Sequence, residues 1–252
     1  MNISRAVVVC VWSAVVVGVA SAAGAAEKAH WTYEGKDGPG HWASLSPEYS
    51  SCAGKSQSPL DLVQARMIEA ELPALAFSYQ PTPLNVLNNG HTIQVDCAGN
   101  STLLVDGRTF RLKQFHFHSP SENLIDGKSY AMEAHLVHAD DEGNLAVVAV
   151  MIESGAANAF LDKVWPSMPA AAGGRTQPAG VQVNVSDLLP ADRDYYRYDG
   201  SLTTPPCTEG VRWLVLKRPV TASPQQVEAF EHVIHHANNR PVQPVNARVV
   251  LK

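Results

Sequence analysis

The sequence has no run of basic side chains and only a small excess of acidic ones. It contains 19 Lys and Arg residues and 24 Asp and Glu residues among 252, which gives a formal net charge of −5. Nucleic acids and anionic membranes are bound through clustered positive charge, so this composition argues against both as partners. A small neutral substrate needs no electrostatic steering and is compatible with it.

The sequence also lacks internal repeats, a low-complexity linker and an HExxH segment. The missing HExxH motif excludes the metalloproteases that depend on it. Because no linker separates two halves, we predict one domain, and the chain is long enough to bury a sizeable core.

The N-terminus has the three parts of a secretory signal peptide. Arg5 precedes an apolar stretch over 6–19, and small residues follow over 20–25. This order predicts a signal peptide over 1–25 and a mature domain over 26–252. The alternative is an uncleaved anchor, but a spanning helix needs about 20 predominantly apolar residues, and Ala, Ser and Gly dilute the last third of this stretch. After cleavage we expect no membrane contact.

Cysteine is scarce, with four residues in the chain and none in a CxxC unit, which excludes a zinc ribbon. Cys10 falls in the predicted signal peptide. Export would allow disulfides to persist. Cys52, Cys97 and Cys207 remain, so at most one bridge forms within the mature chain, and their spacing does not say which pair closes.

Short apolar runs between Pro- and Gly-rich turns predict a mainly β (α+β) domain with a few short helices. One helix is predicted to begin after Ser223, with Pro224 in its first position and Gln226 completing a capping box, and to end before Pro241. The predicted strands are 93–95, 102–105, 111–118, 130–138, 145–152 and 211–216.

The segment 114–118, Gln-Phe-His-Phe-His, is the clearest chemical signal. In a strand, Gln114, His116 and His118 share one face, and the two phenylalanines bury the other. Two imidazoles side by side on a rigid strand suit a metal ion. The alternative is a pair of ordinary core or surface histidines, because an isolated HxH is weak evidence.

The strand predicted over 130–138 places Glu133 and His135 on one face. If it pairs with the first strand, His135 supplies a third imidazole, and three histidines with no fourth protein ligand are typical of catalytic zinc. Gln114 and Glu133 would then accept hydrogen bonds from imidazole N–H groups. His138 lies on the opposite face, where we expect a structural role.

Together with other segments, these motifs resemble the α-class carbonic anhydrases from His30 to the C-terminus. The segments that carry the resemblance are 114–118, Ser121-Glu122, 133–138 (Glu-Ala-His-Leu-Val-His), 201–206 (Ser-Leu-Thr-Thr-Pro-Pro), 30–33 (His-Trp-Thr-Tyr), 54–59 (Gly-Lys-Ser-Gln-Ser-Pro), 88–91 (Asn-Asn-Gly-His) and 238–241 (Asn-Asn-Arg-Pro). Asn123 departs from the family, since many relatives carry a histidine there, and it could alter the hydrogen bonding near Glu133.

The resemblance implies a twisted, mostly antiparallel central sheet of about ten strands and Zn²⁺ on His116, His118 and His135. The resemblance also implies the activity, which is the reversible conversion of carbon dioxide and water to bicarbonate and a proton through attack of a zinc-bound hydroxide. Thr203 would accept a hydrogen bond from the hydroxide and donate its own proton to Glu122. Thr204 would contact bicarbonate.

Further roles follow from the same resemblance. Carbon dioxide has no dipole and would lie against an apolar wall of Val137, Val147, Leu202, Val211 and Trp213. His91 would shuttle the proton to solvent, since an unperturbed imidazole titrates at about 6.5. The water chain leading to it would be held by Tyr33, Asn89 and Gln94.

The resemblance also implies a Cys52–Cys207 disulfide that steadies the loop carrying Thr203 and leaves Cys97 free. Closing so long a loop contributes about 4–5 kcal/mol in the chain-entropy model. The resemblance to bacterial, exported members of the family predicts a periplasmic enzyme. A homodimer is compatible with the family, although no segment of the sequence predicts an interface.

Two other functions remain open at this point. A cupin-like metalloenzyme would use His116, His118 and Glu122 as part of a three-His, one-Glu set, but the glycine spacing of that fold is missing. A non-catalytic zinc-binding protein on the same scaffold is the other. We expect the helical His232, His235 and His236 to form a solvated surface.

Overall fold

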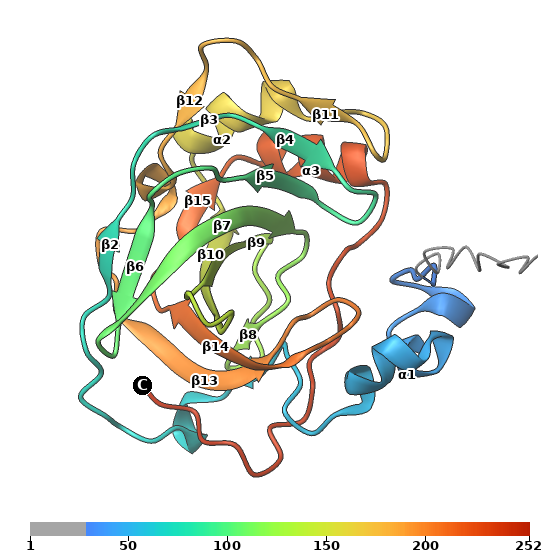
Figure 1. Ribbon diagram of the computed structural model, residues 1–252, viewed down its shortest axis with the longest axis vertical. Helices are drawn as coiled ribbons and strands as arrows, with labels where there is room; N and C mark the ends of the chain where they lie inside the picture. Colours follow the sequence, from blue (N-terminus) through green and yellow to red (C-terminus); the bar gives the residue numbers. More distant parts are fainter. Residues whose placement is uncertain (1–28) are drawn as a thin grey trace, which may run out of the picture.

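The computed structural model describes residues 29–252, so the predicted signal peptide over 1–25 lies outside the described residues. A mixed, 11-stranded sheet forms the centre of the molecule, with the order β11-β4-β5-β7-β9-β10-β14-β13 and with β2, β6 and β15 joined at its sides (Figure 1). This confirms the predicted mainly β fold. Most pairs are antiparallel, but β10 pairs in parallel with both β14 and β15.

The main sheet consists of β2 (Ala76–Ser78), β4 (Val86–Asn88), β5 (Ile93–Asp96), β6 (Thr102–Val105), β7 (Arg108–His118), β9 (Met132–Ala139), β10 (Leu145–Ser154), β11 (Arg175–Thr176), β13 (Tyr195–Ser201), β14 (Glu209–Leu216) and β15 (Val220–Ala222). Two smaller sheets pair β1 (Asp61–Leu62) with β8 (Leu124–Ile125), and β3 (Thr82–Pro83) with β12 (Gln182–Val183). Every predicted strand is present, as β5, β6, β7, β9, β10 and β14.

The alternation of residues in β7 separates a core face from a polar face. Phe115 and Phe117 are fully buried in the largest hydrophobic cluster, together with Phe160 of α2 (Ala159–Val164) and Phe230 of α3 (Pro224–Ile234). The neighbouring polar residues of β7 therefore project from the other face of the sheet, as the sequence pattern predicts.

The helices are short. Besides α2 and α3 there is α1 (Trp42–Leu45), and 3₁₀ segments occur at Gly35–Asp37, Pro47–Ala53, Gln64–Arg66, Trp165–Ser167 and Val185–Leu188. The capping box of Ser223 and Gln226 is present, and α3 ends at His235, whose φ of 65° is left-handed. Within residues 29–252, no helix combines the length and apolar character needed to cross a bilayer.

The segment near the N-terminus packs beside the sheet and is tied to the C-terminal part of the chain. A small cluster joins Trp42 and Tyr49 to the Cys52–Cys207 disulfide, which confirms the expected pairing. The buried guanidinium of Arg240 donates to the carbonyls of Cys52 and Ser58 and to the side chain of Gln57, over 2.8–3.1 Å. Segments far apart in sequence are thus fixed around one region.

Candidate metal centre

Three imidazoles converge on the polar face of the sheet. His116 and His118 lie on β7, and His135 lies on β9 in direct register with His116. One nitrogen from each ring lies within 4.8 Å of the others, and no other group of three His, Cys, Asp or Glu side chains among the described residues does this. The antiparallel pairing that the sequence required for a third ligand is therefore present.

Each imidazole is held through its other nitrogen. The partners are Gln114 Oε1 for His116 Nδ1 at 2.8 Å, the carbonyl of Asn238 for His118 Nδ1 at 2.7 Å, and Glu133 Oε1 for His135 Nε2 at 2.9 Å. Since these partners accept hydrogen bonds, the bonded nitrogens carry the protons and the converging nitrogens are lone-pair donors. Nε2 of His118 is buried and has no hydrogen-bond partner within residues 29–252. This donor set fits a divalent metal ion.

Glu133 is fully buried and accepts hydrogen bonds on both oxygens. Besides His135, it receives the backbone N–H groups of Glu122 and Asn123 at 2.7 and 2.8 Å and the Asn123 amide at 2.7 Å. Burial raises the pKa of Glu133, and the hydrogen bonds from Asn123 oppose this rise. Because every partner is an N–H donor, the site accepts only the ionised carboxylate.

Asn123 connects this network to the next layer of the protein. Its Oδ1 accepts hydrogen bonds from the Tyr198 hydroxyl at 2.9 Å and from the N–H of Leu60 at 3.1 Å. The Tyr198 ring stacks on Trp213, and Trp213 meets His135 edge to face with centroids 4.8 Å apart. The residue that departs from the family pattern does shape the hydrogen bonding at Glu133.

The pKa values of the three histidines favour metal binding. Burial lowers the pKa of His116 and of His135 well below the usual value, and neighbouring imidazoles add to the effect. Burial also lowers the pKa of His118, although the hydrogen bond to Asn238 opposes it. At neutral pH all three rings are uncharged, so protons do not compete with a metal ion for their lone pairs.

Glu122 lies beside the metal centre. Its Oε1 accepts the N–H of Arg240 at 2.8 Å, whereas its Oε2 lies 3.5 Å from Nε2 of His118 and 3.8 Å from Nδ1 of His135. Oε2 is buried and has no hydrogen-bond partner among the described residues. Burial raises the pKa of Glu122 well above its usual value, and the Arg240 N–H and the nearby Thr203 hydroxyl lower it. Thr203 is thus close to the carboxylate.

The loop that carries Thr203 and Thr204 is fixed at both ends. The N–H of Leu202 bonds to the carbonyl of Thr208 at 3.0 Å, and the N–H of Cys207 bonds to that of Thr204 at 2.8 Å. Thr203 is 5% exposed, and Thr204 is half-buried. The disulfide attaches the loop to the segment around Cys52.

The residues of the expected apolar wall belong to one hydrophobic cluster. Val147, Val211 and Trp213 are buried in it, and Val137 and Leu202 pack against it while partly exposed. Trp213 brings this cluster into contact with His135.

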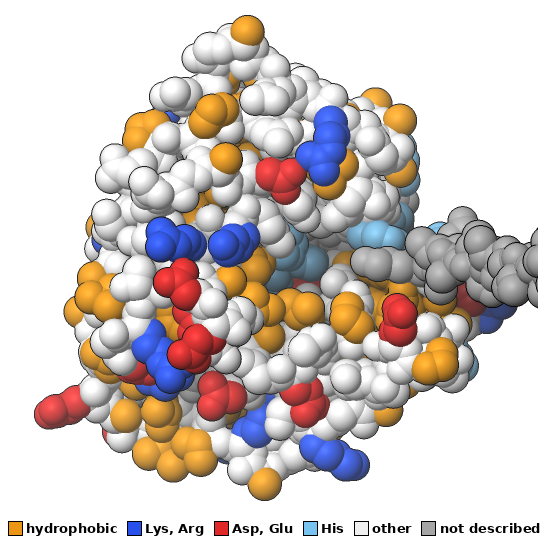
Figure 2. Space-filling model, viewed as in Figure 1, with side chains coloured by type: hydrophobic (Ala, Val, Ile, Leu, Met, Phe, Trp, Pro, Cys, Tyr) orange, Lys and Arg blue, Asp and Glu red, His pale blue; other side chains and the backbone are white. Residues whose placement is uncertain are grey.

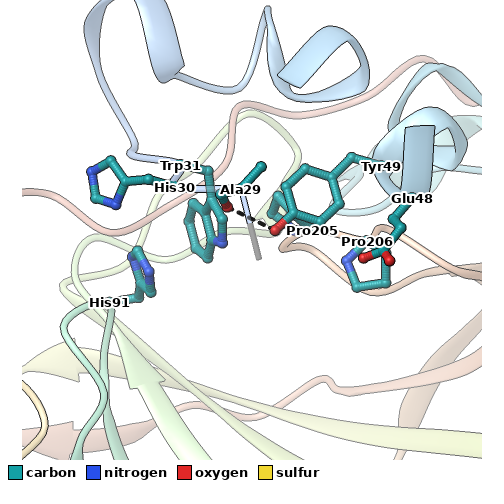
Figure 3. A pocket seen from close by; sticks show the side chains of 8 residues that line it. All are labelled: Ala29, His30, Trp31, Glu48, Tyr49, His91, Pro205 and Pro206. Carbon is teal, nitrogen blue, oxygen red and sulfur yellow. Dashed lines mark hydrogen bonds between the residues drawn. The ribbon is translucent and has the colours of Figure 1, made fainter. Parts of the chain in front are cut away.

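His91 lies at the mouth of the site, where its ring stacks on Trp31 with centroids 3.7 Å apart (Figure 3). Asn89 holds the turn, because its Oδ1 accepts the N–H groups of His91 and Thr92, each at 2.9 Å. Burial, aided by His236 and His30, lowers the pKa of His91 to about 4.

The other residues expected to hold the water chain are Tyr33, Asn89 and Gln94. The Tyr33 hydroxyl is buried and finds no hydrogen-bond partner in the described part of the chain, and burial raises its pKa well above the usual value. Gln94 pairs with His116 across β5 and β7, but its amide donates to Asp96 at 2.6 Å. The side chains of Asn89 and Gln94 are therefore engaged with the protein itself.

A cavity of about 500 Å³ opens beside His91. It is lined by Ala29, His30, Trp31, Glu48, Tyr49, His91, Pro205 and Pro206 (Figure 3). The prolines directly follow Thr204, so this cavity adjoins the loop over the metal centre. Figure 2 shows histidine side chains within a hollow of this face of the molecule.

Sequence reasoning gave no role to three residues that organise the site. Asn238 orients His118, Arg240 binds Glu122, and Tyr198 supports Asn123. The segment 238–241 did carry part of the resemblance, but no spacing rule connects it to a histidine 120 residues earlier.

Comparison with known proteins gives a consistent result. Residues 37–252 match the family model for eukaryotic-type carbonic anhydrase. A carbonic anhydrase of Pectobacterium carotovorum is 47% identical over 239 residues, which cover 94% of this chain and 97% of that protein. One of Neisseria gonorrhoeae is 48% identical over 236 residues, covering 92% and 91%. The structure of an α-carbonic anhydrase from Thermovibrio ammonificans with the inhibitor sulfanilamide matches with a TM-score of 0.87 and 50% identity, over 90% of this chain and 100% of that one.

Proposed function

Because this chain belongs to the eukaryotic-type, or α-class, carbonic anhydrase family, we propose that it is a zinc enzyme that hydrates carbon dioxide to bicarbonate and a proton, reversibly. Its named relatives identify it as a carbonic anhydrase. The proposal concerns the metal and the roles of individual residues. The observation that carries it is the set of three neutral imidazoles whose lone pairs converge while their N–H groups are tied elsewhere.

His116, His118 and His135 would hold the metal. When bound, Zn²⁺ supplies a Lewis acid that lowers the pKa of a coordinated water to about 7, a value for which carbonic anhydrase itself is the reference case. Gln114, Glu133 and the carbonyl of Asn238 orient the three rings. Because Glu133 accepts only N–H donors, it fixes His135 in the tautomer with Nδ1 free.

Thr203 and Glu122 would orient the attacking oxygen. In this proposal Thr203 accepts a hydrogen bond from that oxygen and donates its own hydroxyl proton to Oε2 of Glu122, which has no other hydrogen-bond partner. In this pair of hydrogen bonds, Thr203 can only accept from the group at the metal, because its own proton is donated to Glu122. The arrangement therefore disfavours metal ligands that have no proton to donate. The Arg240 N–H keeps the other carboxylate oxygen in place.

The apolar wall would accommodate carbon dioxide. Val137 and Leu202 are its partly exposed members, so they present the surface that a nonpolar molecule can contact, and Val147, Val211 and Trp213 support them from behind. Thr204, half-buried in the same loop, would contact bicarbonate.

His91 would pass the product proton outward, and the buried hydroxyl of Tyr33 would hold water on its path. Stacked on Trp31, with its pKa lowered to about 4, the ring does not retain a proton at neutral pH. This pKa lies below the unperturbed value of about 6.5 expected from the sequence, so the proposal for His91 rests on its position beside the cavity and not on its pKa.

We also propose that the enzyme is exported to the periplasm after cleavage near residue 25. The Cys52–Cys207 disulfide supports an oxidising compartment. The homodimer suggested by the family stays a prediction.

Stopped-flow hydration of carbon dioxide, with and without sulfanilamide, tests the proposed function. We expect hydration that sulfanilamide blocks and that His116→Ala abolishes, because one ligand is lost. His232→Ala, a change to an exposed histidine, is the control and should leave the rate unchanged. A cupin-like enzyme or a non-catalytic zinc-binding protein would show no hydration under any of these conditions.

The role of His91 has its own test. His91→Ala should lower kcat in dilute buffer and leave kcat/KM unchanged, because proton release follows the attack on carbon dioxide. Added imidazole should restore the rate. If the loss is the same at every buffer concentration, His91 does not transfer protons.

A further inference from the structure

His91 is not the only histidine that lines the cavity beside it, here called the mouth of the cleft. His30 and His236 both lie on a cavity of about 330 Å³ that His91 also lines, along with Trp31, Thr32, Tyr33, Glu34 and Gly90. Both are close enough to His91 to influence its pKa. His91 is half-buried, whereas His236 is exposed to solvent.

We propose that His236 is a second proton acceptor of this enzyme, which takes protons from water in the cleft and releases them to buffer. This inference rests on the proposed function, because it concerns the proton that carbon dioxide hydration produces. It assigns a catalytic task to a histidine that the sequence predicts on a solvated helix surface and that in the structure follows the end of α3.

The position of His236 is fixed by its neighbour Asn238, which is fully buried. The Asn238 amide donates to the carbonyls of His91 and Phe117, each at 2.9 Å, and its own carbonyl accepts from His118 at 2.7 Å. The segment that carries His236 is thus tied both to the turn of His91 and to the metal centre. His30 lies on the same cavity, but no hydrogen bond of its side chain is found within residues 29–252.

The rings at the mouth form a continuous set. The ring centroid of His236 is 5.7 Å from that of Tyr33, and Tyr33 is 6.4 Å from His91. The Tyr33 hydroxyl is buried, and no residue from 29 to 252 forms a hydrogen bond with it. Water that bridges these groups would therefore lie between His91 and His236.

The hydrogen bonding of His236 leaves the correct nitrogen free. Its Nδ1 lies 3.0 Å from the carbonyl of Ala237, which can only accept, so Nδ1 carries the proton of the neutral ring. Nε2 then holds a lone pair in an exposed ring. In the transfer, a cleft water that has received the product proton breaks one O–H bond, an N–H bond forms at Nε2, and neutral water is left. The imidazolium then loses that proton to a buffer base, and the neutral ring is restored.

Several titratable groups surround His236 and set its charge balance. On the cavity side these are His30, Tyr33, Glu34 and His91, and on the side of α3 they are Glu231, His232 and His235.

The test measures carbon dioxide hydration by the zinc-loaded enzyme in dilute buffer and in saturating imidazole. His236→Ala is made alone and together with His91→Ala. His235→Asn is the matched control, because Asn tolerates the left-handed backbone of that position and the His235 ring pairs with His232 outside the cleft cavity.

We expect His236→Ala to lower kcat in dilute buffer at least about threefold in one or both backgrounds, with kcat/KM unchanged and with recovery in imidazole. His235→Asn should behave as wild type. An unchanged kcat in both backgrounds overturns the inference, and so does an equal loss of kcat and kcat/KM that imidazole does not repair. Failure of the proposed function is a separate result, because the wild-type enzyme would then hydrate no carbon dioxide at any imidazole concentration.

Discussion

Each imidazole of the metal centre is held by an acceptor of a different kind. A half-buried amide holds His116, a backbone carbonyl holds His118, and a buried carboxylate holds His135. The carboxylate is the one acceptor with a charge, and it is the most completely bonded, with N–H donors on both oxygens. The orientation of His135 therefore depends most on a single side chain.

Glu133→Gln should weaken zinc binding about 10–100-fold, the usual effect of losing a partner of a metal-bound histidine. The new amide NH₂ would face other N–H donors, and it cannot accept a hydrogen bond from them. Competition with a chelator measures the zinc affinity. Gln114→Ala, at the half-buried partner, should cost less, and an unchanged affinity in Glu133→Gln would show that the carboxylate does not hold His135.

His138 lies on the opposite face of β9 and is structural, since its Nδ1 bonds to the carbonyl of Ala146 at 3.2 Å and its Nε2 to the Tyr79 hydroxyl at 2.7 Å. Burial lowers its pKa to about 4. Between about pH 6.5 and pH 4 the unfolded chain binds this proton more readily, so stability is complete above that window and falls with decreasing pH. The loss amounts to about 3 kcal/mol.

Replacing His138 should therefore flatten the acid side of the stability profile. His138→Gln should be less stable than wild type at pH 7, and the difference should shrink by pH 4. Urea unfolding at several pH values measures this, with the exposed His232→Gln as control. Parallel profiles for His138→Gln and wild type would rule out His138 as a source of the acid sensitivity.

The strands that carry the proposed metal ligands were predictable, because β7 and β9 alternate clearly between buried and polar residues. β13 was missed, since its sequence, Tyr-Tyr-Arg-Tyr-Asp-Gly-Ser, contains two charged residues and a glycine that weaken the pattern. The shortest strands, such as β3 and β11, contain two residues each and have no detectable period. Their pairing is set by tertiary packing, which local sequence does not encode.

The disulfide joins two elements that no strand connects, the 3₁₀ segment Pro47–Ala53 and the loop after β13. Its residues are 155 positions apart, so removing it by Cys52→Ser with Cys207→Ser should cost about 5 kcal/mol in the chain-entropy model. Chemical denaturation measures the loss, and Cys97→Ser, which leaves the bridge intact, is the control. Equal stability of the double variant and wild type would contradict this role.

Across the molecule, the site depends on contacts between distant parts of the chain. Arg240 joins the C-terminal part to the segment 52–58 over separations of 182–188 residues, and Asn238 joins it to His118 over 120. The three converging histidines were predictable because they lie on adjacent strands with regular spacing. Asn238, Arg240 and Tyr198 were not, since their roles exist only once the chain has folded.

The proposed export can be tested on the whole protein. Mass spectrometry of enzyme purified from the periplasm should find a chain that begins near residue 26, and thiol counting after denaturation should find one free cysteine, Cys97. Recovery of the complete chain from the membrane fraction would instead support an uncleaved anchor.

The central claim is that three converging imidazoles bind one zinc ion on which activity depends. It is tested most directly by removing metal from the enzyme and titrating zinc back while following carbon dioxide hydration. The account predicts that the metal-free enzyme is inactive and that activity rises linearly to a plateau at one equivalent of zinc. Undiminished hydration by the metal-free protein, or a protein that takes up no zinc, would contradict it.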